Sequence, residues 1–142
     1  MRGPNPNHRF KNTLGVLTVP FGGKTKDEDF HPGVDYANKM GTPIPSTTDG
    51  VVVKAEDGHV QGEQNFGNTV EIKDQNGDVH QFHHLQNIAV KKGQQVRRGQ
   101  QVAEMSNTGA TYSQSGEGDG THLDLRIVDA FGKYKDPTPY LQ

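Results

Sequence analysis

His31 and Asp35 are the first residues whose types and spacing could support chemistry. They stand on either side of Pro32-Gly33, a pair that marks a tight bend and can bring the two side chains together. A neutral imidazole and a carboxylate are a normal pair of zinc ligands. Taken alone, the pattern is more often explained by a turn histidine hydrogen-bonded to a turn aspartate.

His122 and Asp124 form a second candidate pair, within the segment THLDLRIVD (121–129). Successive side chains of a strand point to opposite faces, so these two residues share a face with Arg126. Leu123, Leu125 and Ile127 require the core, which leaves the other face for solvent or a cleft. An ordinary polar strand face is the competing interpretation.

A third group of imidazoles lies in VHQFHHL (79–85). Strand alternation places His80, Phe82 and His84 on one face, and His83 with Gln81 and Leu85 on the other. Leu85 and Phe82 compete for the buried side, so the pattern alone does not decide between His83 and His84. Solvent-exposed imidazoles are the alternative. His8 and His59 lie in polar surroundings and are interpreted as surface residues.

Together these groups contain the components of a catalytic zinc site, which has three protein ligands and one open position for water. The metal lowers the pKa of that water towards ~7 and polarises a carbonyl. Remaining histidines could move protons or stabilise an oxyanion.

The elements that would position these side chains are short strands separated by turns. Strands are expected at 14–21, 49–57, 68–74, 79–85 and 121–129, with further apolar positions in 93–105 and a Gly/Ser-rich loop at 106–121. Asn76-Gly77 is the strongest short hairpin signal. No helical stripe exceeds two turns. This pattern predicts a single all-β antiparallel domain over 13–142, preceded by a loosely held, flexible arm over 1–12 that is not a signal peptide.

Composition narrows the function classes. The chain has 142 residues, 15 basic and 17 acidic side chains, and no cysteine. Disulfides, thiolate metal sites and a cysteine nucleophile are therefore excluded. The balanced charge argues against nucleic acid as a partner, and no apolar run is long enough for membrane insertion.

The order of several longer segments carries a family resemblance. These segments are Phe21-Gly22 with HPGVDYAN (31–38), GTPIPSTTDGVVV (41–53), GNTVEIKDQNGDVHQFHHL (67–85), VKKGQQVRRGQQVAEMSNTG (90–109) and DPTPYL (136–141). They resemble the lysostaphin-type (LytM-type) zinc endopeptidases, which cut peptide cross-links of bacterial peptidoglycan. The resemblance implies the duplicated hybrid motif fold, an antiparallel β-sheet or sandwich with a metal groove on the sheet face.

The resemblance also implies roles for individual residues. His31 and Asp35 match the first two ligands of one Zn²⁺ ion. His84 matches the catalytic histidine of the family's Y-x-H-L segment. His83 is expected to be dispensable because it faces away from His84 on the same strand. His80 shares the face of His84 but is two residues further along, so it is expected to lie at best behind the site. His122 matches the first, catalytic histidine of H-x-H.

Position 124 departs from the family, because Asp124 stands where the resemblance implies a third histidine ligand. Aspartate also ligates zinc, but a second carboxylate leaves the metal-bound water less acidic and admits other divalent ions. The loop from Thr111 to Gly120 also looks longer than in the family.

The function implied is that of a zinc-dependent peptidoglycan endopeptidase acting on the extracytoplasmic cell wall, secreted or virion-associated, as in a bacteriophage endolysin. It would work as a monomer or within a larger assembly. The alternative is a weakened or inactive domain that binds cell wall or regulates another wall hydrolase.

Overall fold

A computed structural model describes residues 10–25, 28–111 and 118–142. Within these residues the chain forms ten short strands, one helical turn and one 3-10 helix. In order they are α1 (Lys11–Leu14), β1 (Val16–Val19), β2 (Val34–Ala37), β3 (Pro43–Pro45), β4 (Gly50–Glu56), β5 (Asn68–Lys73), β6 (Val79–Gln86), β7 (Gln95–Val96), β8 (Gln101–Met105), β9 (Leu123–Val128), β10 (Tyr134–Lys135) and η1 (Thr138–Leu141).

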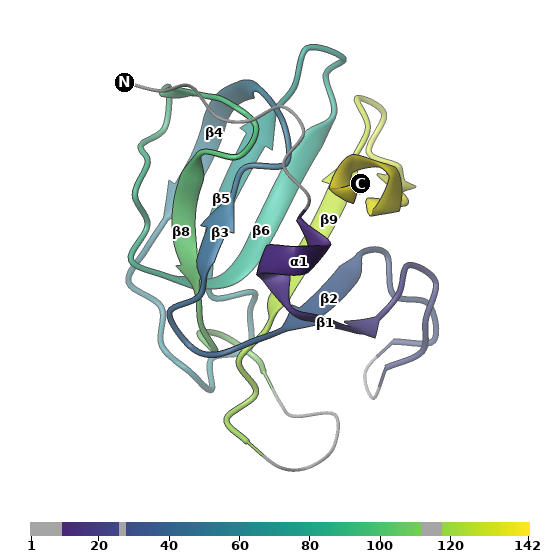
Figure 1. Cartoon of the computed structure of the whole chain (residues 1–142), viewed down its shortest axis with the longest axis vertical. Coiled ribbons are helices and arrows are strands. Elements are labelled where there is room, and N and C mark those ends of the chain that lie inside the picture. Colours follow the sequence, from purple (N-terminus) through teal and green to yellow (C-terminus); the bar gives the residue numbers. More distant parts are fainter. Residues whose placement is uncertain (1–9, 26–27, 112–117) are drawn as a thin grey trace.

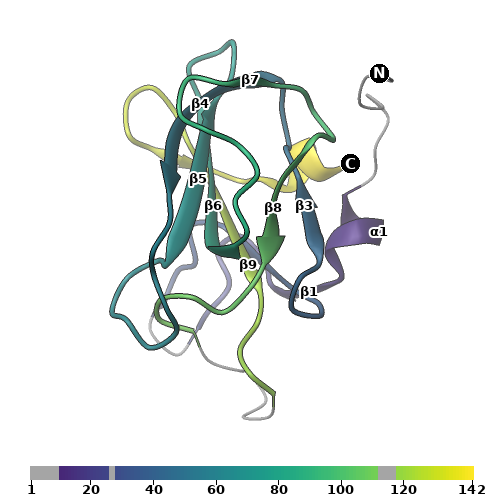
Figure 2. The same cartoon turned by 90° about the vertical axis from the view of Figure 1, so that its left-hand side faces the viewer.

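The strands pair antiparallel in the order β1-β2-β9-β6-β5-β4-β7 (Figure 1). β10 pairs with β9, while β8 pairs with both β6 and β3. Figure 2 shows β3 and β8 standing apart from β4 and β5, on the side of the molecule where α1 lies. The predicted all-β antiparallel fold is confirmed.

The core fills the space between these strands. Alternation along β5 buries Val70 and Ile72, and alternation along β9 buries Leu123, Leu125 and Ile127, all at 0% exposure. Both patterns were expected from the sequence. The predicted hairpin turn is also present, since Gly77 adopts φ 84° between β5 and β6.

The opposite face of the sheet carries the residues of interest. Directly opposed residues of antiparallel strands share a face. Asp35 of β2 lies opposite Asp124 of β9, and Asp124 in turn lies opposite His83 of β6. One row across three adjacent strands therefore presents two carboxylates and an imidazole on the same side.

The N-terminal boundary differs from the prediction. Most of the expected arm, residues 1–9, lies outside the described residues, but Phe10 is completely buried in the core. The expected strand 14–21 is shorter, because Leu14 ends the turn α1 and β1 begins at Val16. Phe10 and Leu14 are four residues apart, so one helical turn directs both side chains into the core.

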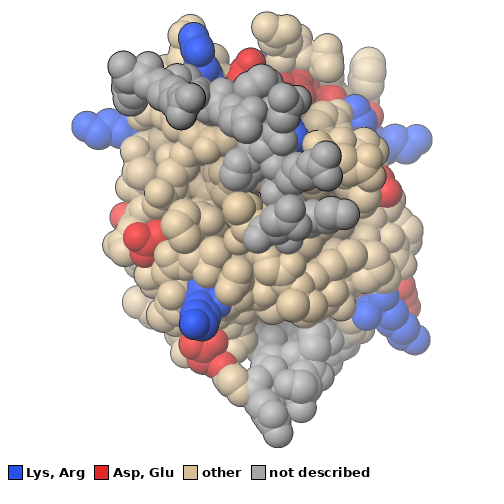
Figure 3. Space-filling model, viewed as in Figure 1, with Lys and Arg blue, Asp and Glu red and all other residues tan. Residues whose placement is uncertain are grey.

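Charges are scattered on the face shown in Figure 3, where the described Lys, Arg, Asp and Glu side chains form no continuous patch of one sign. Among the described residues, no helix has the length and apolar character needed to cross a membrane.

Candidate metal and catalytic site

The loop before β2 is held by backbone hydrogen bonds at His31, the first residue that the sequence predicts for the site. Backbone hydrogen bonds connect Gly22 N to His31 O and His31 N to Gly23 O, each at 2.8 Å. Phe21 and Phe30 pack edge to face with ring centroids 5.2 Å apart. His31 is thereby fixed at the entrance to β2 with only 1% of its surface exposed.

Gly33 allows β2 to approach β9 closely. A Cβ atom at this position would lie 2.4 Å from the carbonyl oxygen of Leu125 and 2.7 Å from Cγ of Arg126. No side chain can be accommodated there without separating the two strands. The bend expected at Pro32-Gly33 therefore also sets the distance between His31, Asp35 and β9.

We expect Gly33→Ala to lower the free energy of unfolding by about 1–3 kcal/mol, as overpacking does, and to weaken zinc binding as well. Gly58→Ala is the control: Gly58 has φ 89° and a Cβ atom added there would meet no other atom within 4 Å, so it should cost stability alone, about 1 kcal/mol. Urea unfolding and zinc titration measure the two effects. A Gly33→Ala protein with an unchanged zinc affinity would contradict this assignment.

Three donor groups converge at this position. One ligand atom each from His31, Asp35 and Asp124 lies within 4.8 Å of the others, and all three residues are buried. Nε2 of His31 is 2.9 Å from Oδ1 of Asp35. The spacing and the nitrogen and oxygen donors fit a divalent ion such as Zn²⁺. The structure thus brings together the three residues that the resemblance matched to metal ligands.

Arg126 already binds the third of these residues. Its Nε and Nη2 atoms donate to the two carboxylate oxygens of Asp124, each at 2.9 Å. This is a two-bond arginine–carboxylate pair, buried on both sides. Asp124 could bind an ion only through its remaining lone pairs. Arg126 therefore neutralises the negative charge of Asp124. A neutral histidine at position 124 would carry no charge that needed such a partner.

His31 lies between two carboxylates, since its Nδ1 atom is also 3.0 Å from Oε1 of Glu28. Burial alone would lower the pKa of His31, but the hydrogen bond and charge of Asp35, with Asp124 and Glu28, outweigh it and raise this pKa to about 9. The metal-free imidazole is therefore protonated at neutral pH. A metal ion must displace that proton in order to bind Nε2.

His84 and His122 form a pair of imidazoles with ring centroids 4.7 Å apart. Nδ1 of His84 donates to the carbonyl of Thr108 at 2.7 Å, and Nδ1 of His122 donates to the carbonyl of Gly120 at 2.8 Å. Since a carbonyl can only accept, each neutral ring keeps its free lone pair on Nε2. Burial and the neighbouring His122 lower the pKa of His84 to about 4, so this residue is a neutral acceptor.

The backbone at His84 explains how it reaches this position. Alternation holds along β6 as far as His83. His84 has a φ of 63°, a backbone conformation that residues other than glycine rarely adopt. At this residue β6 leaves β9, with which it last pairs at His83, and begins to pair with β8, where Leu85 opposes Met105, while its register with β5 shifts. The expectation that His84 shares a face with His80 is therefore wrong.

His80 and His83 also differ from expectation. His80 faces the core at 0% exposure, and its ring nitrogens contact Thr47 at 2.6 Å and Asp74 at 3.0 Å, so its polar atoms are satisfied away from the site. His83 does not point away from the site, because it shares the face of Asp124. The stated reason for treating His83 as dispensable is therefore wrong.

Sequence reasoning missed Arg126 and Glu28 as partners of the site. The alternation that grouped Arg126 with Asp124 was a usable signal, because opposite charges two residues apart on one strand face can pair. Glu28 lies in a loop of no regular period, so no comparable signal existed. The longer loop expected at 111–120 lies largely outside the described residues.

A comparison with known families identifies the class of protein. The model of peptidase family M23 matches residues 29–137, which is most of the chain. The chain therefore belongs to peptidase family M23, a zinc-dependent family whose members include peptidoglycan endopeptidases.

Individual relatives include both an enzyme and an activator. Peptidoglycan DD-endopeptidase ShyA of Vibrio cholerae is 40% identical over 98 residues, covering 69% of this chain and 20% of its own. Murein hydrolase activator NlpD of Escherichia coli is 30% identical over 129 residues, covering 91% of this chain and 30% of its own. The chain thus spans less than a third of either relative.

Among solved structures, a zinc-containing peptidase from Vibrio cholerae superposes with a TM-score of 0.70 at 25% identity. The match covers 99% of this chain and 40% of that one. This similarity extends over almost the whole of this chain.

Proposed function

We propose that the protein is a metal-dependent endopeptidase that cuts peptide bonds of bacterial peptidoglycan. The proposal rests on the convergence of His31, Asp35 and Asp124 within 4.8 Å, together with the imidazole pair of His84 and His122. Membership of a zinc-dependent peptidase family and the similarity to a DD-endopeptidase support the same activity.

The roles of the residues follow from their hydrogen bonds. His31, Asp35 and Asp124 would hold the ion, which when bound supplies a Lewis acid for the peptide carbonyl and for water. His84 and His122 each keep a lone pair on Nε2, so either can take the proton of the attacking water. Once protonated, the same Nε2–H can donate to the leaving amine. The carbonyls of Thr108 and Gly120 keep both rings in the tautomer that this requires.

The experiment is hydrolysis of purified peptidoglycan, measured as released amino groups with zinc and with a chelator. We expect release that the chelator abolishes and zinc restores. His31→Ala should lose bound metal and activity together, while His8→Ala should retain both. Retention of stoichiometric metal by His31→Ala would show that the ligand assignment is wrong, and the absence of chelator-sensitive release on any wall type would refute the activity.

A second function is favoured by one specific contact, the two hydrogen bonds of Arg126 to Asp124. An internal cation that neutralises a ligand weakens the demand for a metal. The similarity to a murein hydrolase activator is consistent with a domain that binds the cell wall or activates another hydrolase. Wall binding without hydrolysis in the experiment above would select this function.

The place of action proposed under either function is the extracytoplasmic cell wall. The substrate or binding partner is a peptidoglycan peptide. Secretion, incorporation into a virion or a bacteriophage endolysin would each bring the domain there. The domain would act alone or as part of a larger assembly.

A further inference from the structure

A pocket of about 380 Å³ lies on the site face of the sheet, beside the metal-binding candidates. Its floor comes from β4, β5 and β6, and its lining includes Lys54, Glu56, Glu71, His83 and Tyr134. The volume lies within the range of small-ligand pockets. His83 connects the pocket to the candidate metal site, since it opposes Asp124 across β6 and β9.

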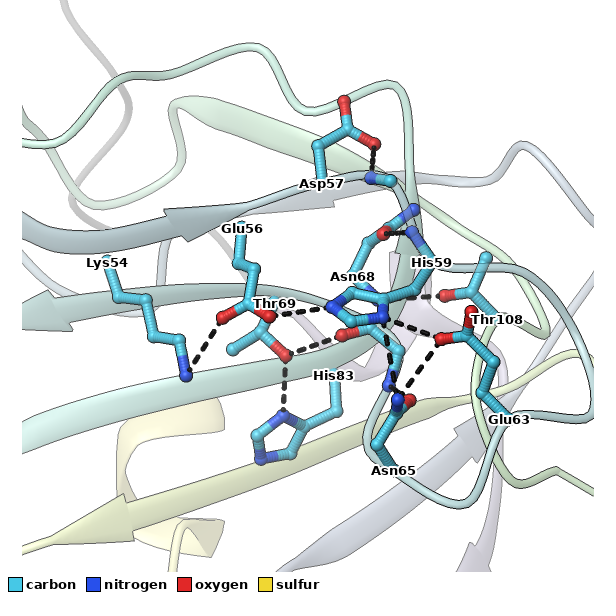
Figure 4. Close-up of polar contacts among 12 residues, drawn as sticks. Lys54, Glu56, Asp57, His59, Glu63, Asn65, Asn68, Thr69, His83 and Thr108 are labelled. Carbon is cyan, nitrogen blue, oxygen red and sulfur yellow. Dashed lines mark hydrogen bonds and ion pairs between the residues drawn. The ribbon is translucent and has the colours of Figure 1, made fainter.

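His83 is the buried member of this lining, with 4% exposure. Figure 4 shows its Nδ1 atom against Thr69, at 3.2 Å. The single hydroxyl proton of Thr69 is donated to the carbonyl of Gly67, so Thr69 accepts from Nδ1–H of His83. Nε2 of His83 therefore carries a lone pair, and no hydrogen-bond partner reaches it among the described residues.

The second acceptor in the pocket is Glu71. Its carboxylate forms no hydrogen bond or ion pair with another described residue. The nearby lysine is already engaged, because Nζ of Lys54 lies 3.3 Å from Glu56, as Figure 4 also shows. Glu56 in turn contacts His59 at 2.6 Å. Glu71 is thus the lining carboxylate that makes no ion pair with a described residue, even though Lys54 lies directly opposite it across β4 and β5.

Two aromatic rings complete the lining. Phe66 stacks on His83 with ring centroids 4.2 Å apart, and Tyr134 belongs to β10. The guanidinium carbon of Arg126 lies 4.7 Å from the ring centroid of Phe66 and 6.0 Å from that of Tyr134, so these rings already face a cation. The groups left for a ligand are an unpaired carboxylate and an unpaired imidazole lone pair, which suit a ligand that donates hydrogen bonds and carries positive charge. A primary ammonium group on an alkyl chain has this chemistry.

We propose that this pocket binds a primary ammonium group of the wall peptide, such as a diamino-acid side chain or a free peptide N-terminus, through Glu71 and Nε2 of His83. This inference rests on the proposed function, because it takes a wall peptide as the ligand. It adds that a substrate with a free amine beside the reacting bond is preferred to one whose amine is blocked.

The test uses two probes that differ only in the amine, Nα-acetyl-L-lysyl-D-alanine and the same dipeptide acetylated at Nε. Each is titrated calorimetrically into the full chain in the presence of chelator, so that cleavage plays no part. We expect the free amine to bind about tenfold more tightly, the scale of one charged hydrogen bond. Equal affinities would overturn the proposal.

Three variants identify the residues responsible. Glu71→Gln should abolish the preference for the free amine, and His83→Phe should reduce it while keeping a ring against Phe66. Glu104→Gln is the matched control, because Glu104 lies on β8 and contacts Gln86 and Asn87 instead of the pocket. Persistence of the preference in Glu71→Gln would contradict the assignment.

The two proposals fail separately. Amine-dependent binding without chelator-sensitive hydrolysis would support the pocket and count against the peptidase. Hydrolysis of peptidoglycan without amine-dependent binding would support the peptidase and count against the pocket.

Discussion

Replacing Asp124 with alanine is expected to destabilise the domain by about 3–5 kcal/mol, because it leaves a buried charge without its partner. Arg126 is 6% exposed and makes both of its 2.9 Å contacts to Asp124. Its remaining carboxylate contact is to Glu28 at 3.5 Å. A loss of this size is a large part of the ~5–15 kcal/mol that holds a typical domain folded. Urea unfolding in chelator measures it.

The control is the paired replacement Asp124→Leu with Arg126→Met. It removes both charges and fills similar volume, so most of the lost stability should return. If Asp124→Ala alone were as stable as the starting protein, the buried charge of Arg126 would not need the Asp124 carboxylate for the domain to remain stable.

A single Arg126→Met change separates the structural and metal-binding roles of Asp124. Without the guanidinium, a divalent ion would be the main positive charge available to this carboxylate. Zinc should therefore raise the melting temperature of Arg126→Met by more than it raises that of the starting protein. Equal increases would show that Asp124 is not a ligand.

The stability of the metal-free domain is expected to be greatest near pH 6.5 and to fall by a few kcal/mol on each side, at ~1.4 kcal/mol for each unit of pKa shift. On the alkaline side, the folded pKa of about 9 for His31 lies above the ordinary value. Its contribution is complete below the unfolded pKa and is lost as the pH rises through 9.

The acidic side follows from two imidazoles that are buried in the neutral form. Burial lowers the pKa of His83 to about 3 and that of His84 to about 4. Between these values and the unfolded value, the unfolded chain binds protons that the folded chain does not, so stability falls as the pH decreases. Urea unfolding in chelator at pH 4.5, 6.5 and 9 tests both limbs. His31→Gln should flatten the alkaline limb only, and an unchanged slope there would refute its origin in His31.

The regular strands were predictable because their side chains obey one rule. The period of two in 68–74 and 121–129 placed Val70, Ile72 and Leu123 in the core, and the structure agrees. The same rule grouped Asp124 with Arg126. Strand alternation could not predict that Asp124 and Arg126 would form an ion pair, because it predicts which face a side chain lies on and not the distance between two side chains.

The rule failed where one residue left the strand conformation. No pattern of apolar and polar residues encodes the positive φ of His84, which falls where β6 leaves β9 and begins to pair with β8. The turn α1 was missed for a different reason. Two buried residues, Phe10 and Leu14, are too few to establish a helical period in a polar segment.

The left-handed backbone conformation of His84 matters for any attempt to engineer a more stable version of this domain. A design that scored only backbone conformation would favour glycine at this position, since glycine adopts φ 63° without steric cost. The same substitution would delete an imidazole whose tautomer is set by Thr108 and whose ring lies against His122. Backbone preference and the proposed catalytic role of His84 thus compete at a single position, and selection on the backbone alone would remove the imidazole.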